Sequence, residues 1–342
     1  MKNSFYLLFA LMLFGCKTQQ KGQHNLTLDP KIKVIFQDSI AAGQTITQDN
    51  LEYFFDYISM ADIEIQTKQN FAPNTSRKTA VDRYKDFLRK DVMDFSKADL
   101  TFIEAVLEEM YQLCSQVSSD IFPSELILIK THGKHYGNSV YYTRENSIVI
   151  PADALDQQNH NAFLSTMLHE LSHIYTRYHP KKKKALYQLI GFEEIGTLGS
   201  LKMDNALEEI LLLNPDGINF AQRIQLTQGK EKISAIPIIT AKKKNYDPAM
   251  PNFFLYLDFN IYQVKAGKVI SDENGKSTLQ LAAFPDFFTQ IKDNTQYIIH
   301  PDEIIADNFM HYFMSLRATP PDNSFSEEGT KLLEALKNTI AK

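Results

Sequence analysis

The feature that most constrains the fold of this chain is a helical run from Asn161 to Tyr178, which contains neither glycine nor proline. Its apolar residues recur at the 3.6-residue spacing of one helix face. These residues are Phe163, Met167, Leu168, Leu171 and Ile174. In the same run, His169 and His173 stand four residues apart, so their imidazoles lie one turn apart and can reach one ion. The sequence therefore predicts an amphipathic helix that carries two metal ligands.

Glu170 follows the first histidine and completes a His-Glu-x-x-His pattern. In zinc sites with this pattern, the glutamate holds a water molecule in the open coordination position. The zinc ion polarises a peptide carbonyl and lowers the pKa of the water, while the glutamate passes the proton to the leaving amine. A pattern of only five residues can also occur by chance in a chain of this composition. Its place on an uninterrupted helix, after strand-like segments, favours one zinc ion with Glu170 as general base.

The third protein ligand has two candidates. His179 stands ten residues after His169, where the extended metzincin pattern places its third histidine. In that pattern a glycine turns the backbone, but this chain has Thr176 at the glycine position. The helix is therefore expected to continue past Thr176 and to stop just before Pro180, which carries His179 away from the metal. The other candidate is Glu303.

A second predicted helix begins with a proline, which suits the first helical turn, and places Glu303 and Asp307 on one face. This segment resembles the gluzincin superfamily of zinc peptidases, whose thermolysin-like members carry a ligand glutamate and an aspartate four residues later. The resemblance implies that Glu303 is the third ligand and that Asp307 orients His169 by accepting its free ring N–H. Asp302 is expected to do the same for His173. Without a metal, acidic residues in this first turn also suit the helix dipole.

A zinc peptidase of this type also needs a hydrogen-bond donor for the oxyanion of the tetrahedral intermediate. Tyr297, just before the second helix, is the predicted donor, and the alternatives close to the motifs are Tyr178, Arg177 and Tyr262. The segment Asn214-Pro215-Asp216-Gly217 is interpreted as a turn rather than a substrate loop.

The N-terminal residues predict export. Lys2 precedes an apolar stretch that is too short to span a membrane and is typical of a signal peptide. The segment Leu13-Phe14-Gly15-Cys16 resembles the bacterial lipobox, which implies cleavage before Cys16 and a lipid on that cysteine; an ordinary cleaved signal is the alternative. A lipidated Cys16 leaves Cys114 without a partner for an intramolecular disulfide. We therefore expect a protein anchored by lipid to a bacterial membrane, outside the cytoplasm.

The predicted fold class is α+β, with a zincin-like catalytic domain of a small sheet, the histidine helix and a second ligand helix. The expected divisions are a lipoprotein signal peptide (1–15), a lipid-anchored tether (16–30), a helical N-terminal region (31–122) and the catalytic domain (123–342) with a β-rich insertion at about 230–285. Expected strands are Leu126–Ile129, Ser139–Tyr142, Ser147–Ile150, Ile233–Thr240 and Phe253–Val264. Further expected helices are Ala98–Val117, Pro301–Leu316 and Glu327–Ala341.

Composition limits the partners. The chain has 44% hydrophobic residues and a formal net charge of −5, so it can build a core but has no basic footprint for nucleic acid. The lysine runs 181–184 and 242–244 are expected to be solvated. A peptide or protein is the predicted substrate, and no oligomeric state is predicted. The competing functions are a zinc-binding lipoprotein without turnover and a zinc amidase that acts on peptidoglycan peptides.

Overall fold

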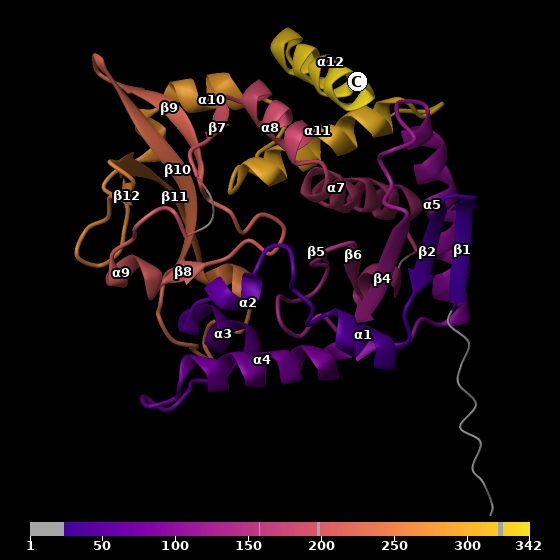
Figure 1. Cartoon of the computed structure of the whole chain (residues 1–342), viewed down its shortest axis with the longest axis horizontal. Coiled ribbons are helices and arrows are strands. Elements are labelled where there is room, and N and C mark those ends of the chain that lie inside the picture. Colours follow the sequence, from indigo (N-terminus) through magenta and orange to yellow (C-terminus); the bar gives the residue numbers. More distant parts are fainter. Residues whose placement is uncertain (1–23, 157, 197–198, 321–323) are drawn as a thin grey trace, which may run out of the picture.

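Two β-sheets lie at opposite ends of the molecule, with helices between and around them (Figure 1). The structure is a computed structural model that describes residues 24–156, 158–196, 199–320 and 324–342. Within these ranges the chain is an α+β protein, as predicted. The predicted signal peptide and Cys16 lie outside the described residues. No helix in the described ranges is long and apolar enough to cross a membrane.

The first sheet has the strand order β1-β2-β4-β6-β5. Strands β2, β4 and β6 run parallel, whereas β1 and β5 are antiparallel to their neighbours, and the short β3 pairs with the end of β4. The strands are β1 (His24–Asp29), β2 (Ile32–Phe36), β3 (Val92–Met93), β4 (Glu125–Thr131), β5 (Tyr142–Arg144) and β6 (Ser147–Pro151). A parallel centre requires apolar side chains on both faces, and β4 and β6 are accordingly buried along most of their length.

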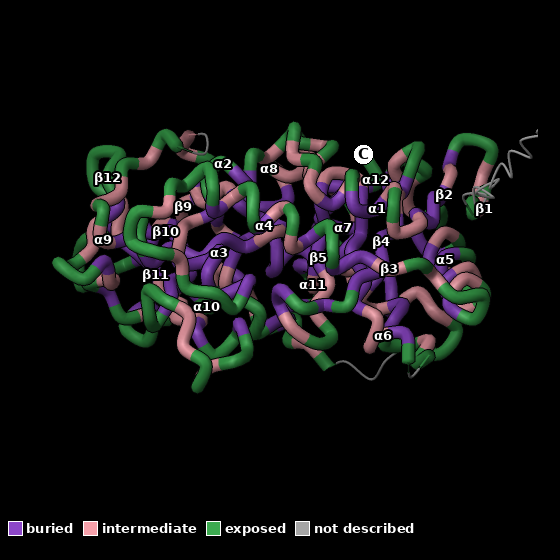
Figure 2. The backbone as a smooth tube through the Cα atoms, turned by 90° about the horizontal axis from the view of Figure 1, so that it is seen from below, coloured by how far each residue is buried: buried purple, intermediate pink, exposed green. Residues whose placement is uncertain are grey.

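Helices cover both faces of this sheet. In β4, Leu126 and Leu128 point into a core shared with α5 (Lys97–Ser115) and α7 (His160–Tyr178). Ile129 points into a second core on the other face. That core includes residues of α1 (Ser39–Thr45), α2 (Phe54–Tyr57), α3 (Met60–Thr67) and α4 (Arg77–Asp91). The buried segments lie in the interior of the molecule and the exposed ones around its outside (Figure 2).

The second sheet is antiparallel, with the order β12-β11-β10-β9-β7, and β8 also pairs with β10. Its strands are β7 (Phe192–Glu194), β8 (Leu211–Leu212), β9 (Gln222–Gln228), β10 (Glu231–Ala241), β11 (Leu257–Lys265) and β12 (Lys268–Val269). The flanking short elements are α9 (Asn205–Glu208), η1 (Phe253–Tyr256), η2 (Leu281–Ala283) and α10 (Pro285–Ile291).

Helices α7 and α11 (Pro301–Ser315) pack side by side between the sheets (Figure 1). The Asn159 side chain caps α7 by accepting from the Ala162 N–H at 3.2 Å. The helix ends at Tyr178 because His179 precedes Pro180, which starts α8 (Pro180–Leu189). The C-terminal α12 (Glu327–Ala341) packs against α8 and α11. The remaining helix is α6 (Asp153–Asp156).

Two predicted boundaries were wrong. Residues from His24 onward, expected as tether, form β1, and the region 31–122 contributes β2 and β3 to the first sheet besides its helices. This region therefore shares a sheet with β4 instead of packing on it as a helical unit. The β-rich part begins with β7 at Phe192, well before the expected 230, because β7 and β9 extend the β10–β11 pair.

Candidate metal centre

The two predicted ligand helices bring their side chains together. His169 and His173 face α11 from consecutive turns of α7, and Glu303 faces them from the first turn of α11. Their ligand atoms all lie within 4.8 Å of one another. We call these three residues the candidate metal centre.

The distances suit a small ion. Glu303 Oε2 lies 3.0 Å from His169 Nε2 and 3.6 Å from His173 Nε2. Tetrahedral ligands at about 2.0–2.1 Å from zinc are roughly 3.3 Å apart, so the two observed separations bracket that value. Both ring nitrogens of His173 are buried and have no hydrogen-bond partner among the described residues. An unpaired buried imidazole is costly, and a cation between these atoms would satisfy Nε2.

A groove of about 380 Å³ opens onto this centre and contains the predicted general base. Glu170 is buried, and its Oε2 has no partner among the described residues. Tyr297 lines the same groove, and its ring stacks on His169 with centroids 6.2 Å apart. Tyr141 also lines this groove, and it was not among the tyrosines selected from the sequence.

Asp307 lies where the sequence placed it. Its Oδ1 is 2.9 Å from His169 Nδ1, so a proton on Nδ1 leaves Nε2 free to face Glu303. The other oxygen of Asp307 accepts a hydrogen bond from the Thr295 hydroxyl. Asp307 thus holds His169 through Nδ1, while Nε2 points toward Glu303.

The prediction for Asp302 was wrong. Its Oδ2 accepts a hydrogen bond of 2.8 Å from Lys183 Nζ on α8, and no described residue bonds to His173 Nδ1. The physical reason is the helix geometry, because Asp302 lies about 100° around α11 from Glu303 and therefore faces α8. This ion pair also means that Lys183, expected to be solvated, is largely buried.

The segment Asn214–Gly217 is buried against the candidate metal centre rather than exposed as a surface turn. Asn214 Nδ2 donates to Glu303 Oε1 at 2.6 Å. Asp216 lies beside Glu170 and His173, with their side-chain atoms within 4.8 Å, and accepts from the Thr143 hydroxyl at 2.6 Å. Both Asn214 and Asp216 are buried. Sequence reasoning missed these two residues. The apolar run Leu211-Leu212-Leu213 before them is the sequence signal of a segment that enters the core, and the structure buries all three leucines.

Gly217 lets this segment approach α11 closely. A Cβ at this position would lie 2.3 Å from His300 Nδ1 and 2.7 Å from Asp302 Oδ2. Only glycine fits without displacing those two buried side chains. The backbone after Asp216 is therefore packed against the start of the ligand helix.

The alternative third ligand, His179, and the alternative oxyanion donors lie outside the groove. His179 is the C-cap of α7, and its Nδ1 is 2.8 Å from the Tyr175 carbonyl oxygen, as expected for a helix that continues past Thr176. The Arg177 guanidinium donates hydrogen bonds to Glu52 and Thr143. Tyr262 donates to the Gly275 carbonyl at 3.2 Å. Tyr178 lines a different cavity. Of the four tyrosine and arginine candidates, Tyr297 is the one in the groove.

The two histidines and Glu303 of the candidate metal centre stabilise one another's charged forms. Burial alone lowers the pKa of His169, but its hydrogen bonds to Asp307 and Glu303 outweigh burial and raise the pKa well above the usual value. Burial alone raises the pKa of Glu303, but the nearby histidines lower it well below the usual value. A bound cation would take over the role of the imidazole protons, so metal binding would release protons.

The pKa of Glu170, the general-base candidate, is shifted in the opposite direction to that of Glu303. Burial, and next the negative charge of Asp216, raise the pKa of Glu170 to about 8. Burial also raises the pKa of Tyr297 well above its usual value, and the surrounding carboxylates add to that rise. The Tyr297 phenol therefore keeps its proton and remains a hydrogen-bond donor.

Comparison of the chain with protein-family models, with curated proteins and with solved structures finds no match. The function is therefore inferred from the geometry of this centre and its groove.

Proposed function

We propose that the protein is a zinc metallopeptidase with a zincin-like catalytic region. The observation that carries the proposal is the convergence of His169, His173 and Glu303 beside a groove that also holds Glu170. Two imidazoles and one carboxylate with an open side are a ligand set of catalytic zinc. Glu170 is not needed as a ligand, so its buried, unpartnered oxygen favours catalysis over a purely structural metal site.

In this proposal, each residue around the zinc has a separate role in peptide hydrolysis. When bound, zinc supplies a Lewis acid for the scissile carbonyl and lowers the pKa of the attacking water. Glu170 Oε2 accepts a proton from that water and delivers it to the leaving amide nitrogen. The Tyr297 hydroxyl donates a hydrogen bond to the oxygen on which negative charge develops. Asp307 and Thr295 keep His169 in one tautomer and orientation.

The test is metal analysis of the full chain together with peptide-library cleavage. We expect one zinc per chain in the wild type, a large loss of zinc in Glu303→Ala, and cleavage that Glu170→Gln abolishes while zinc is retained. A His179→Ala variant is the matched control, and it should keep its zinc. Zinc retained by Glu303→Ala would refute the ligand assignment.

The class of substrate is tested by a separate cleavage assay. A library of peptidoglycan peptides, assayed beside ordinary peptides, separates a peptidase from an amidase of the cell wall. Stoichiometric zinc without cleavage of either library would favour a zinc-binding module without turnover.

We also propose that the protein is exported and lipid-anchored through Cys16, on the basis of the lipobox-like segment that precedes it. Metabolic labelling with a radioactive fatty acid should mark the wild type and leave Cys16→Ser unlabelled. Equal labelling of the two proteins would contradict the anchor.

A further inference from the structure

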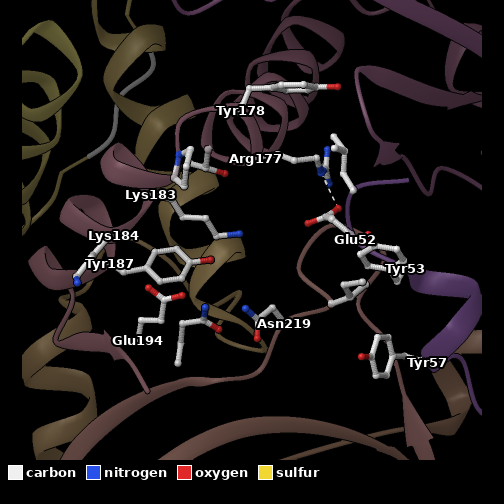
Figure 3. Close-up of a pocket in the computed structure, with 15 residues that line it drawn as sticks. Glu52, Tyr53, Tyr57, Arg177, Tyr178, Lys183, Lys184, Tyr187, Glu194 and Asn219 are labelled. Carbon is white, nitrogen blue, oxygen red and sulfur yellow. Dashed lines mark hydrogen bonds and ion pairs between the residues drawn. The ribbon is translucent and has the colours of Figure 1, made fainter. Parts of the chain in front are cut away.

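A second cavity, of about 610 Å³, lies at the far end of α7 from the groove and shares none of its lining residues. It forms where the turn between α7 and α8, the segment before α2 and the segment 218–222 meet (Figure 3). Its volume falls within the range of about 300–1,000 Å³ that is typical of small-ligand sites. The proposed peptidase chemistry makes no use of it.

Exposed aromatic side chains gather at this cavity. Nine large apolar residues are exposed in the described part of the chain, and four of them line it. The four are Leu51, Tyr53, Tyr57 and Tyr178. Tyr53 also has a left-handed backbone (φ 60°), which is strained for a bulky residue. Solvent-exposed aromatic rings concentrated at one cavity are typical of a binding site.

The inner wall holds neutral polar groups with unused hydrogen-bonding capacity. Tyr187 is 3% exposed, and its hydroxyl points into the cavity beside the Asp302 carboxylate, where the hydroxyl oxygen can still accept a hydrogen bond from a ligand (Figure 3). Gln222 is 5% exposed, and its Oε1 has no hydrogen-bond partner among the described residues. Asn219 uses its side-chain oxygen to accept from the Ala221 N–H, which leaves its amide nitrogen available to a ligand. The buried, unpartnered oxygen of Gln222 requires water or a ligand.

The charges around the cavity are balanced. Arg177 pairs with Glu52 at 2.6 Å, and Lys183 pairs with Asp302 at 2.8 Å. These pairs leave one cation, Lys184, and one carboxylate, Glu194, without ion pairs among the described residues that line the cavity. With no excess of positive charge, the cavity does not favour a polyanion such as a nucleotide.

We propose that this cavity binds a neutral oligosaccharide. Sugar rings present apolar C–H faces that stack on tyrosines, and their hydroxyl groups both donate and accept, which matches the Tyr187 hydroxyl and the carboxamides of Gln222 and Asn219. A peptide is less suited, because β7, the edge strand that ends at Glu194, offers only three residues for main-chain pairing. The site would hold a glycan, or a glycosylated substrate, away from the groove.

The test measures binding to the full chain by saturation-transfer NMR and calorimetry, with maltotriose and chitotriose as probes. Trigalacturonate, ATP and tetra-alanine serve as comparison ligands. We expect at least one neutral trisaccharide to bind, with saturation transferred to its C–H protons. The proposal is overturned if neither trisaccharide binds, so that the cavity holds water only, or if ATP or tetra-alanine displaces the bound sugar.

Variants locate the binding in the cavity. Tyr187→Phe removes only the hydroxyl, and we expect it to weaken binding about tenfold by removing one hydrogen bond. Tyr57→Ala, at a side chain 38% exposed, should weaken binding without affecting folding. Tyr111→Phe, which removes a hydroxyl bonded to Asp29 elsewhere, is the control and should bind like the wild type. Unchanged binding in both Tyr187→Phe and Tyr57→Ala would refute the site. Binding in Glu303→Ala separates this result from the fate of the peptidase proposal.

Discussion

Asn214 donates a hydrogen bond of 2.6 Å to Glu303, from a segment 89 residues earlier in the chain. The bond occupies Glu303 Oε1, while Oε2 faces both histidines. Asn214 therefore fixes which oxygen of the carboxylate is presented to the candidate metal centre.

Asn214→Ala should weaken metal binding by about 10–100-fold, the usual cost of losing a group that orients a ligand. The measurement is competition for zinc against a chelator of known affinity. The matched control is Asn146→Ala, which removes a side-chain bond of 2.8 Å to the Glu125 carbonyl at an exposed site. If both variants bind zinc like the wild type, Asn214 does not position Glu303.

Asp307 and Asp302 should behave differently although both are acidic residues of α11. Asp307→Asn disturbs the tautomer of His169 and should weaken zinc binding by about 10–100-fold. Asp302→Asn breaks the buried pair with Lys183 and should lower the free energy of unfolding by roughly 1–3 kcal/mol, with a smaller effect on zinc affinity. Zinc titration and urea unfolding of both variants separate the two roles. The reverse pattern would restore the sequence-based role of Asp302.

Gly217→Ala should be destabilising because the new Cβ would lie 2.3 Å from His300 Nδ1. We expect a loss of roughly 1–3 kcal/mol in the free energy of unfolding, typical of overpacking. Gly43→Ala is the control, since its nearest contact, the Arg89 carbonyl oxygen at 3.5 Å, is ordinary. Thermal unfolding of the two variants tests this expectation, which fails if Gly217→Ala is as stable as Gly43→Ala.

Asp62 should make stability depend on pH. Burial raises the pKa of this carboxyl from its ordinary value of 3.8 to about 7, although Gln66 and the Leu213 N–H donate hydrogen bonds to it. The folded state therefore binds more protons than the unfolded state between these two values, so this contribution to stability is present at low pH and is lost as pH rises to about 7.

Asp62→Asn cannot titrate at this position. Its free energy of unfolding, measured with urea at several pH values, should fall less steeply than that of the wild type between about pH 4 and pH 7. Parallel curves for the two proteins would show that Asp62 does not titrate in this range.

Helices were the most predictable part of the fold. The run Asn161–Tyr178 matches α7 within one residue at its start, and Glu327–Ala341 matches α12. Local signals define these helices, including the 3.6-residue apolar spacing and proline next to the ends. Strands were less predictable, since Ser139–Tyr142 was expected where β5 is Tyr142–Arg144. The strands that were not predicted are β1, β2, β3, β7, β8, β9 and β12.

The sequence by itself was enough to propose the candidate ligands. Spacing placed His169 and His173 on one helix face, and the resemblance to the gluzincins selected Glu303 and Asp307 on another. Only the tertiary structure decided what surrounds them. Asn214 and Asp216 come from a loop whose sequence resembles an exposed turn, and Asp302 pairs with Lys183 across 119 residues. Such contacts depend on how distant elements pack, and the periodicity of one segment contains no information about the partner that another segment brings to it.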